Sequence, residues 1–229
     1  MSELRIALVA EGLTDFIVIE AALKAILPEP FILTLLQPEA TRPDLGGGWG
    51  GVLKWCREFQ SRGAATLESD PTLARFDVFI IHLDADVAGK SYADLAVTAR
   101  ADWGHLPCQR ECPPPDNTVE ALRAVLCSWL GNVQPTHTTV LCMPAQSTEA
   151  WLAAGVYPDN ATLLADVECS ANMESRLGSL PKRTRIKKSG REYRIHARTL
   201  ATNWASVRNI CSQADVFHCS VLDAIQRVD

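Results

Sequence analysis

The sequence predicts an α/β fold, in which a mainly parallel sheet is flanked by helices and followed by a mostly helical C-terminal region. Short apolar runs typical of buried strands alternate with helical patterns over about the first 155 residues. From Tyr157 onward the helical patterns continue, but no convincing strand pattern follows. We therefore divide the chain into a core, residues 1–155, and a helical C-terminal extension, residues 156–229.

Four apolar stretches are typical of strands. The first is a continuous apolar run with one charge, which suits a strand covered on both faces. The third is the strongest, because β-branched and aromatic residues recur over its eight positions. The expected strands are Leu4–Ala10, Phe31–Leu36, Phe76–Leu83 and Thr138–Met143.

Helical patterns separate these strands and fill the C-terminal extension. We expect Thr14 to cap the first helix and the glycine-rich loop Gly46–Gly51 to precede the second. The expected helices are Asp15–Leu27, Val52–Arg62, Ser91–Ala101, Thr118–Leu130, Gln146–Ala154, Ala197–Gln213 and Val216–Val228.

The composition is that of an ordinary globular protein, with 47% hydrophobic and 21% charged residues among 229. No apolar run reaches the roughly 18 residues that a membrane helix needs. The apolar N-terminal stretch is too short for the hydrophobic region of a signal peptide. We expect a cytoplasmic protein without a membrane partner.

The eight cysteines are scattered along a chain that is long enough to build a hydrophobic core, so reduced and mostly buried thiols are expected. His105, Cys108 and Cys112 lie close in sequence, but their spacing matches structural zinc sites poorly.

A basic segment lies between Lys182 and Arg198, in a chain whose formal net charge is -5. It holds eight basic residues against the single acid Glu192. Such a segment suits a polyanion, although a solvated loop would have the same composition. The candidate nucleic-acid contacts are Lys182, Arg183, Arg185, Lys187, Lys188 and Arg191.

Three acidic residues follow two of the predicted strands. Glu11 lies where the first strand turns into the first helix, and Gly12 is expected to permit the tight turn. Asp84 and Asp86 end the third strand, where alternation would place them on the same side. If the two strands are neighbours, all three carboxylates meet.

Clustered carboxylates repel one another, and a hard divalent ion such as Mg²⁺ or Mn²⁺ relieves that repulsion. Each motif has an ordinary structural interpretation as well. Acidic residues are common in loops after strands, and Glu11 could simply favour the positive end of the first helix.

The pattern resembles the TOPRIM domain, in which a Glu-Gly pair follows the first strand and an Asp-x-Asp motif follows a later one. Glu11-Gly12-Leu13-Thr14-Asp15 is similar to the overcoming-lysogenization-defect nucleases and to small bacterial TOPRIM-like proteins. The helix with Glu149 and Trp151, and the basic stretch around Tyr193, look similar too. The resemblance covers about residues 4–155 and implies a Rossmann-like TOPRIM fold.

The resemblance implies a metal-dependent endonuclease that cleaves phosphodiester bonds in DNA or RNA. Glu11 would be a metal ligand or general acid/base, Asp84 and Asp86 would be metal ligands, and Glu149 would hold a second ion. A role in bacterial phage defence would involve a separate ATPase subunit, because this chain has no GxxxxGK[ST] motif. Lys54 and Lys90 are further candidate phosphate contacts.

Two other functions compete with this hypothesis. A nucleotide-sugar glycosyltransferase also uses an Asp-x-Asp motif, but it leaves Glu11-Gly12 unexplained. A TOPRIM-like module without catalytic activity would bind nucleic acid or a partner ATPase. The choice between DNA and RNA and the oligomeric state are both open at this point.

Overall fold

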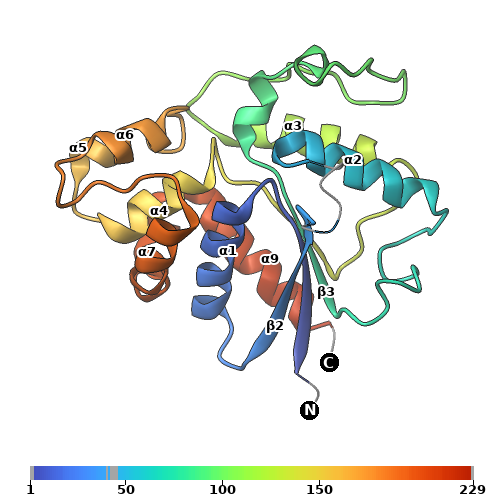
Figure 1. Cartoon of the computed structure of the whole chain (residues 1–229), viewed down its shortest axis with the longest axis horizontal. Coiled ribbons are helices and arrows are strands. Elements are labelled where there is room, and N and C mark those ends of the chain that lie inside the picture. Colours follow the sequence, from blue (N-terminus) through green and yellow to red (C-terminus); the bar gives the residue numbers. More distant parts are fainter. Residues whose placement is uncertain (1–2, 40, 42–45, 228–229) are drawn as a thin grey trace.

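The computed structural model describes residues 3–39, 41 and 46–227, and its centre is a four-stranded parallel sheet (Figure 1). The strand order is β2-β1-β3-β4, and all three neighbouring pairs are parallel. The strands are β1 (Leu4–Val9), β2 (Phe31–Gln37), β3 (Val78–His82) and β4 (Thr139–Cys142). The predicted α/β class, with a parallel sheet and a helical C-terminal region, is confirmed.

Helices cover both faces of the sheet (Figure 1). One face carries α2 (Gly48–Ser61) and α3 (Asp116–Leu130). The opposite face carries α1 (Leu13–Ile26), α4 (Thr148–Val156), α7 (Gly190–Thr202), α8 (Trp204–Ile210) and α9 (Ser212–Ile225). Shorter elements are the 3-10 helices η2 (Ala85–Gly89) and η3 (Tyr92–Leu95), with α5 (Ala161–Leu164) and α6 (Met173–Ser179).

Strand alternation explains why the apolar runs are continuous. In β1, Ile6 and Leu8 pack in the hydrophobic cluster with α1 and α4, whereas Ala7 and Val9 pack in the cluster with α2 and α3. Because each face is buried, both sets of positions must be apolar.

The C-terminal helices complete the core on one face. Tyr193 and Leu200 of α7, and Phe217 and Val221 of α9, are buried in the same cluster as Ile6 of β1. The sheet and the C-terminal helices therefore share one hydrophobic cluster.

Two predicted helices are wrong in extent. The expected Ser91–Ala101 helix is only η3, after which Ala96 adopts a left-handed backbone with φ 53°. After η3 the chain folds back, so that Tyr92 and Trp103 are both buried and their rings are in contact. The Tyr92 hydroxyl donates to Gly104 O at 2.8 Å and holds this arrangement.

The expected helix Ala197–Gln213 is interrupted at Asn203, which separates α7 from α8. The Asn203 side chain donates to Gly155 O at 2.8 Å, so a contact with α4 holds the break. A second break at Cys211 separates α8 from α9. The last helix ends at Ile225, and Val228 lies outside the described residues.

Two expectations about the first helix are also wrong. Its N-cap is Gly12, with no capping bond from a side chain, so Thr14 does not cap it. Gly12 has φ -158° and ψ 177°, an extended conformation open to any residue, so no tight turn depends on it. The second helix begins inside the glycine-rich loop, at Gly48.

A disulfide joins Cys112 to Cys169, contrary to the expectation that all thiols are reduced. The two residues are 57 positions apart, and only the tertiary fold brings the loop before α3 to the segment between α5 and α6. Cys112 is therefore not available as a zinc thiolate. The other six cysteines are free.

Within the described part of the chain, no helix is both long enough and apolar enough to cross a membrane.

Candidate metal centre

The candidate site lies at the carboxyl ends of β1 and β3, which are adjacent and parallel. The chain leaves β1 for β2 on one side, whereas β3 pairs on the other side. Such a reversal of strand order opens a crevice in which α/β proteins commonly bind ligands. Glu11 and Asp84 each follow their strand by two residues, so the topology brings them together.

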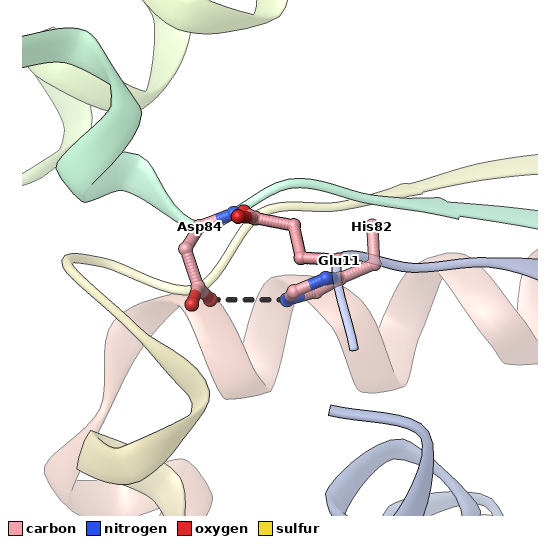
Figure 2. Close-up of side chains that lie close together, drawn as sticks. All are labelled: Glu11, His82 and Asp84. Atoms are coloured by element: carbon pink, nitrogen blue, oxygen red, sulfur yellow. Dashed lines mark hydrogen bonds and ion pairs between the residues drawn. The ribbon is translucent and has the colours of Figure 1, made fainter. Parts of the chain in front are cut away.

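Glu11, His82 and Asp84 form a close group (Figure 2). One potential ligand atom from each lies within 4.8 Å of the others. Glu11 Oε1 accepts the backbone N–H of Asp84 at 2.8 Å, and His82 Nε2 lies 3.0 Å from Asp84 Oδ1. Among the described residues, Glu11 Oε2 and Asp84 Oδ2 have no hydrogen-bond partner, so both carboxylates keep an oxygen for a ligand.

His82 is a member of this group that the sequence analysis did not include. It is the last residue of β3, and alternation places it on the face covered by α1 and α4, where it is fully buried. Its Nδ1 has no hydrogen-bond partner among the described residues. A polar residue in an otherwise apolar strand was the signal that could have identified it.

Asp86 is not a member of the close group. The expected alternation does not apply, because β3 ends at His82 and Asp86 lies in η2. The Asp86 carboxylate is partly exposed and lies 3.9 Å from Lys90 Nζ. Asp86 does share with Asp84 a small pocket of about 80 Å³.

Glu149 lies in the first turn of α4 and lines the same pocket. Its side chain is almost completely buried and already has two protein partners on Oε1. The Tyr193 hydroxyl donates to this oxygen at 2.7 Å, and Lys188 Nζ lies 3.0 Å from it. Glu149 is therefore neutralised by the protein itself.

Asp15 and Thr148 fix the site from two helices. Both are buried, and the Thr148 hydroxyl donates to Asp15 Oδ1 at 2.6 Å. The Thr148 backbone N–H donates to Asp84 Oδ1 at 3.1 Å. The sequence analysis quoted Asp15 within a motif, and it gave neither residue a role.

The pKa shifts of Glu11 and Asp84 are opposite in direction to that of Glu149. Burial, and then the charge of Asp84, raise the pKa of Glu11 well above its usual range. Burial and the charges of Asp15, Glu149 and Asp86 likewise raise the pKa of Asp84. Burial also raises the pKa of Asp86, although Lys90 and Lys188 oppose the shift.

Glu149 shows the opposite behaviour. Burial alone would raise its pKa, but the Lys188 ammonium and the Tyr193 hydroxyl outweigh burial and lower it. At the carboxylates that follow β1 and β3, burial and neighbouring negative charges thus outweigh the nearby positive charge, whereas at Glu149 the positive charge outweighs burial.

The basic segment begins in the loop before α7 and continues into that helix. Ile186 is buried and its N–H donates to Leu177 O at 3.1 Å, which anchors the loop. Lys188 alone among the candidate contacts lines the acidic pocket. Arg185 is partly buried, whereas Lys182, Arg183, Lys187 and Arg191 are exposed.

The two candidate phosphate contacts outside this segment occupy different places. Lys90 lies at the edge of the site beside Asp86, whereas Lys54 lies in α2 on the opposite face of the sheet.

Comparisons with protein-family models, with curated proteins and with solved structures find no match for this chain.

Proposed function

We propose that this chain is a Mg²⁺- or Mn²⁺-dependent nuclease that cleaves phosphodiester bonds in DNA or RNA. The observation that carries the proposal is the meeting of Glu11 and Asp84, from separate strand ends, in a group where burial and mutual repulsion outweigh the nearby positive charge. Their uncommitted oxygens are donors that Mg²⁺ and Mn²⁺ prefer, and His82 adds a nitrogen that Mn²⁺ also accepts. A bound ion would supply an activated water and positive charge at the phosphate.

The protein groups have complementary tasks in this proposal. Glu11, with its raised pKa, is suited to take a proton from the attacking water or return one to the leaving oxygen. Asp84 would hold the ion, and Asp86, which lines the same pocket, would hold water ligands of the ion. Lys188 Nζ, which lines the same pocket, would add positive charge beside the phosphate.

The exposed basic residues would bind the nucleic-acid backbone. Arg191, Arg194 and Arg198 are exposed and recur along α7 at spacings that place them on one face. They extend the positive charge of the loop that carries Lys182 and Lys187.

Binding should therefore weaken as salt rises, by a slope of about 0.9 per phosphate contact for duplex DNA. Lys187→Ala should reduce that slope. Lys24→Ala is the control, because Lys24 is also an exposed lysine but lies in the last turn of α1. An equal salt dependence in the wild type, Lys187→Ala and Lys24→Ala would show that Lys187 does not contact the nucleic-acid backbone.

The decisive experiment incubates the purified chain with plasmid DNA and with RNA, in Mg²⁺, Mn²⁺ or EDTA. Metal-dependent cleavage that Asp84→Asn abolishes is the expected result. Cleavage that survives this substitution would trace the activity to a contaminant or another site. The resemblance to overcoming-lysogenization-defect nucleases extends the proposal to cytoplasmic phage defence with a separate ATPase subunit.

A module without catalytic activity is the second candidate, and one observation favours it. Asp84 and Glu149 are both held by hydrogen bonds or ion pairs within the protein. Nucleic-acid binding that needs no divalent ion, without cleavage under any condition, would support this function.

A further inference from the structure

Lys188 is placed as an internal cation of the acidic pocket. Its ammonium lies 3.0 Å from Glu149 Oε1 and 3.4 Å from Glu174 Oε2, so two elements, α4 and α6, hold it. The same pocket is lined by Asp84 and Asp86. A positive charge thus already stands beside the proposed metal ligands.

Several contacts make this placement specific. The Lys188 side chain is 41% exposed, but its partner Glu149 is only 1% exposed, and a buried carboxylate is costly unless it is paired. Tyr193 donates to the same Glu149 oxygen and so fixes the orientation of the carboxylate. On the other side of Lys188, the Ser189 hydroxyl accepts the Glu192 N–H and begins α7, which limits how far the loop can move.

We infer that the site takes one divalent ion, at Glu11, His82 and Asp84, and that Lys188 occupies the place a second ion would need. This inference rests on the proposed metal-dependent function. In this arrangement Glu149 is a positioning residue, which holds the lysine and does not bind metal. A second ion beside Glu149 would have to displace the ammonium or accept repulsion from it at short range.

The test counts the Mn²⁺ ions bound by the purified chain at pH 8, from the loss of the free-ion signal in electron paramagnetic resonance. The wild type should bind one ion. Lys188→Met keeps the length of the side chain and removes its charge, so Glu149 and Glu174 become available and a second ion should bind. Lys188→Arg should return the count to one. Lys187→Met is the matched control, because it removes a neighbouring exposed charge and should leave the count at one.

A second pair of variants distinguishes ligand from positioning residue. Glu149→Gln should weaken Mn²⁺ binding by no more than about 10- to 100-fold, the range of indirect effects, whereas Asp84→Asn should abolish binding. Two ions on the wild type, or one on Lys188→Met, would overturn the inference while leaving the metal site intact. An absence of Mn²⁺ binding in wild type and all variants would instead overturn the proposed metal-dependent function. Circular dichroism of each variant confirms that it is folded.

Discussion

Asp84→Asn should stabilise the metal-free protein. Asn keeps the shape of the side chain and an oxygen that can accept the hydrogen bonds from Thr148 and His82. It removes the negative charge that faces Glu11 in a buried site. In contrast, Asp84→Ala would leave the Thr148 N–H without its acceptor, at a cost of about 1 to 3 kcal/mol, so it would mix two effects.

The magnitude follows from the geometry. Two unit charges at the 4.8 Å limit of this group repel by about 3.5 kcal/mol at an effective dielectric constant of 20. Changing two hydrogen bonds from a charged to a neutral acceptor costs about 1 kcal/mol each. The net gain is about 1.5 kcal/mol, which corresponds to a Tm rise of roughly 3 to 6 °C for a chain of this size.

The assay is thermal unfolding at pH 8 in EDTA, and Asp70→Asn is the control. Asp70 is also a buried aspartate, but it accepts hydrogen bonds from Thr72 and lies 3.5 Å from an Arg62 nitrogen. Burial would raise its pKa, yet these partners lower it, so its charge stabilises the fold. Asp70→Asn should therefore lower the Tm. A similar fall for Asp84→Asn would refute the repulsive cluster and leave Asp84 as an ordinary structural residue.

Three further predictions concern pH, the disulfide and Glu149. The pKa of Asp84 in the folded protein is raised above the ordinary value of about 4, so above pH 4 the folded protein retains a proton that the unfolded chain loses. The Tm in EDTA should therefore fall as the pH rises from about 4 to the pKa of Asp84 in the folded protein. A Tm that rises between pH 5 and 9, or a fall unaffected by saturating Mg²⁺, would contradict this. Replacing Cys112 and Cys169 by Ser should lower the free energy of unfolding in guanidinium by up to about 4 kcal/mol, because the disulfide closes a loop of 57 residues. The denatured, unreduced wild type should titrate six thiols rather than eight. Tyr193→Phe should cost about 1 to 2 kcal/mol, since it removes a hydrogen bond to the buried Glu149 carboxylate, and an unchanged unfolding midpoint would show that this bond is not formed.

The sheet could be predicted because its strands are buried on both faces. Continuous apolar runs such as the one around Ile6 and Leu8 are typical of strands that helices cover on both faces. The irregular region after β3 could not be predicted, because the Ser91–Ala101 sequence has local helical character. Packing of Tyr92 against Trp103 and Trp129 overrides that preference, and such contacts have no local signature.

The candidate site was predictable to the extent that it depends on strand ends. Glu11 and Asp84 follow strands that are neighbours in a parallel sheet, so their meeting follows from topology. The role of Asp86 depended on whether β3 continued for two more residues, which an apolar pattern does not resolve. His82 was missed because a buried histidine in a strand resembles ordinary core until its neighbours are known.

The role of Lys188 shows what charge patterns leave undetermined. Eight basic residues in one segment indicate that it binds a polyanion, but the sequence alone does not distinguish the role of one basic residue from that of another. The fold separates them, because Ile186 and the start of α7 fix the chain on either side of Lys188. Its ammonium is thereby committed to Glu149 and Glu174, whereas Lys182 and Lys187 are exposed and do not line that pocket. Neutralising Lys188 should accordingly alter the number of bound metal ions, whereas neutralising Lys187 should alter only the salt dependence of nucleic-acid binding.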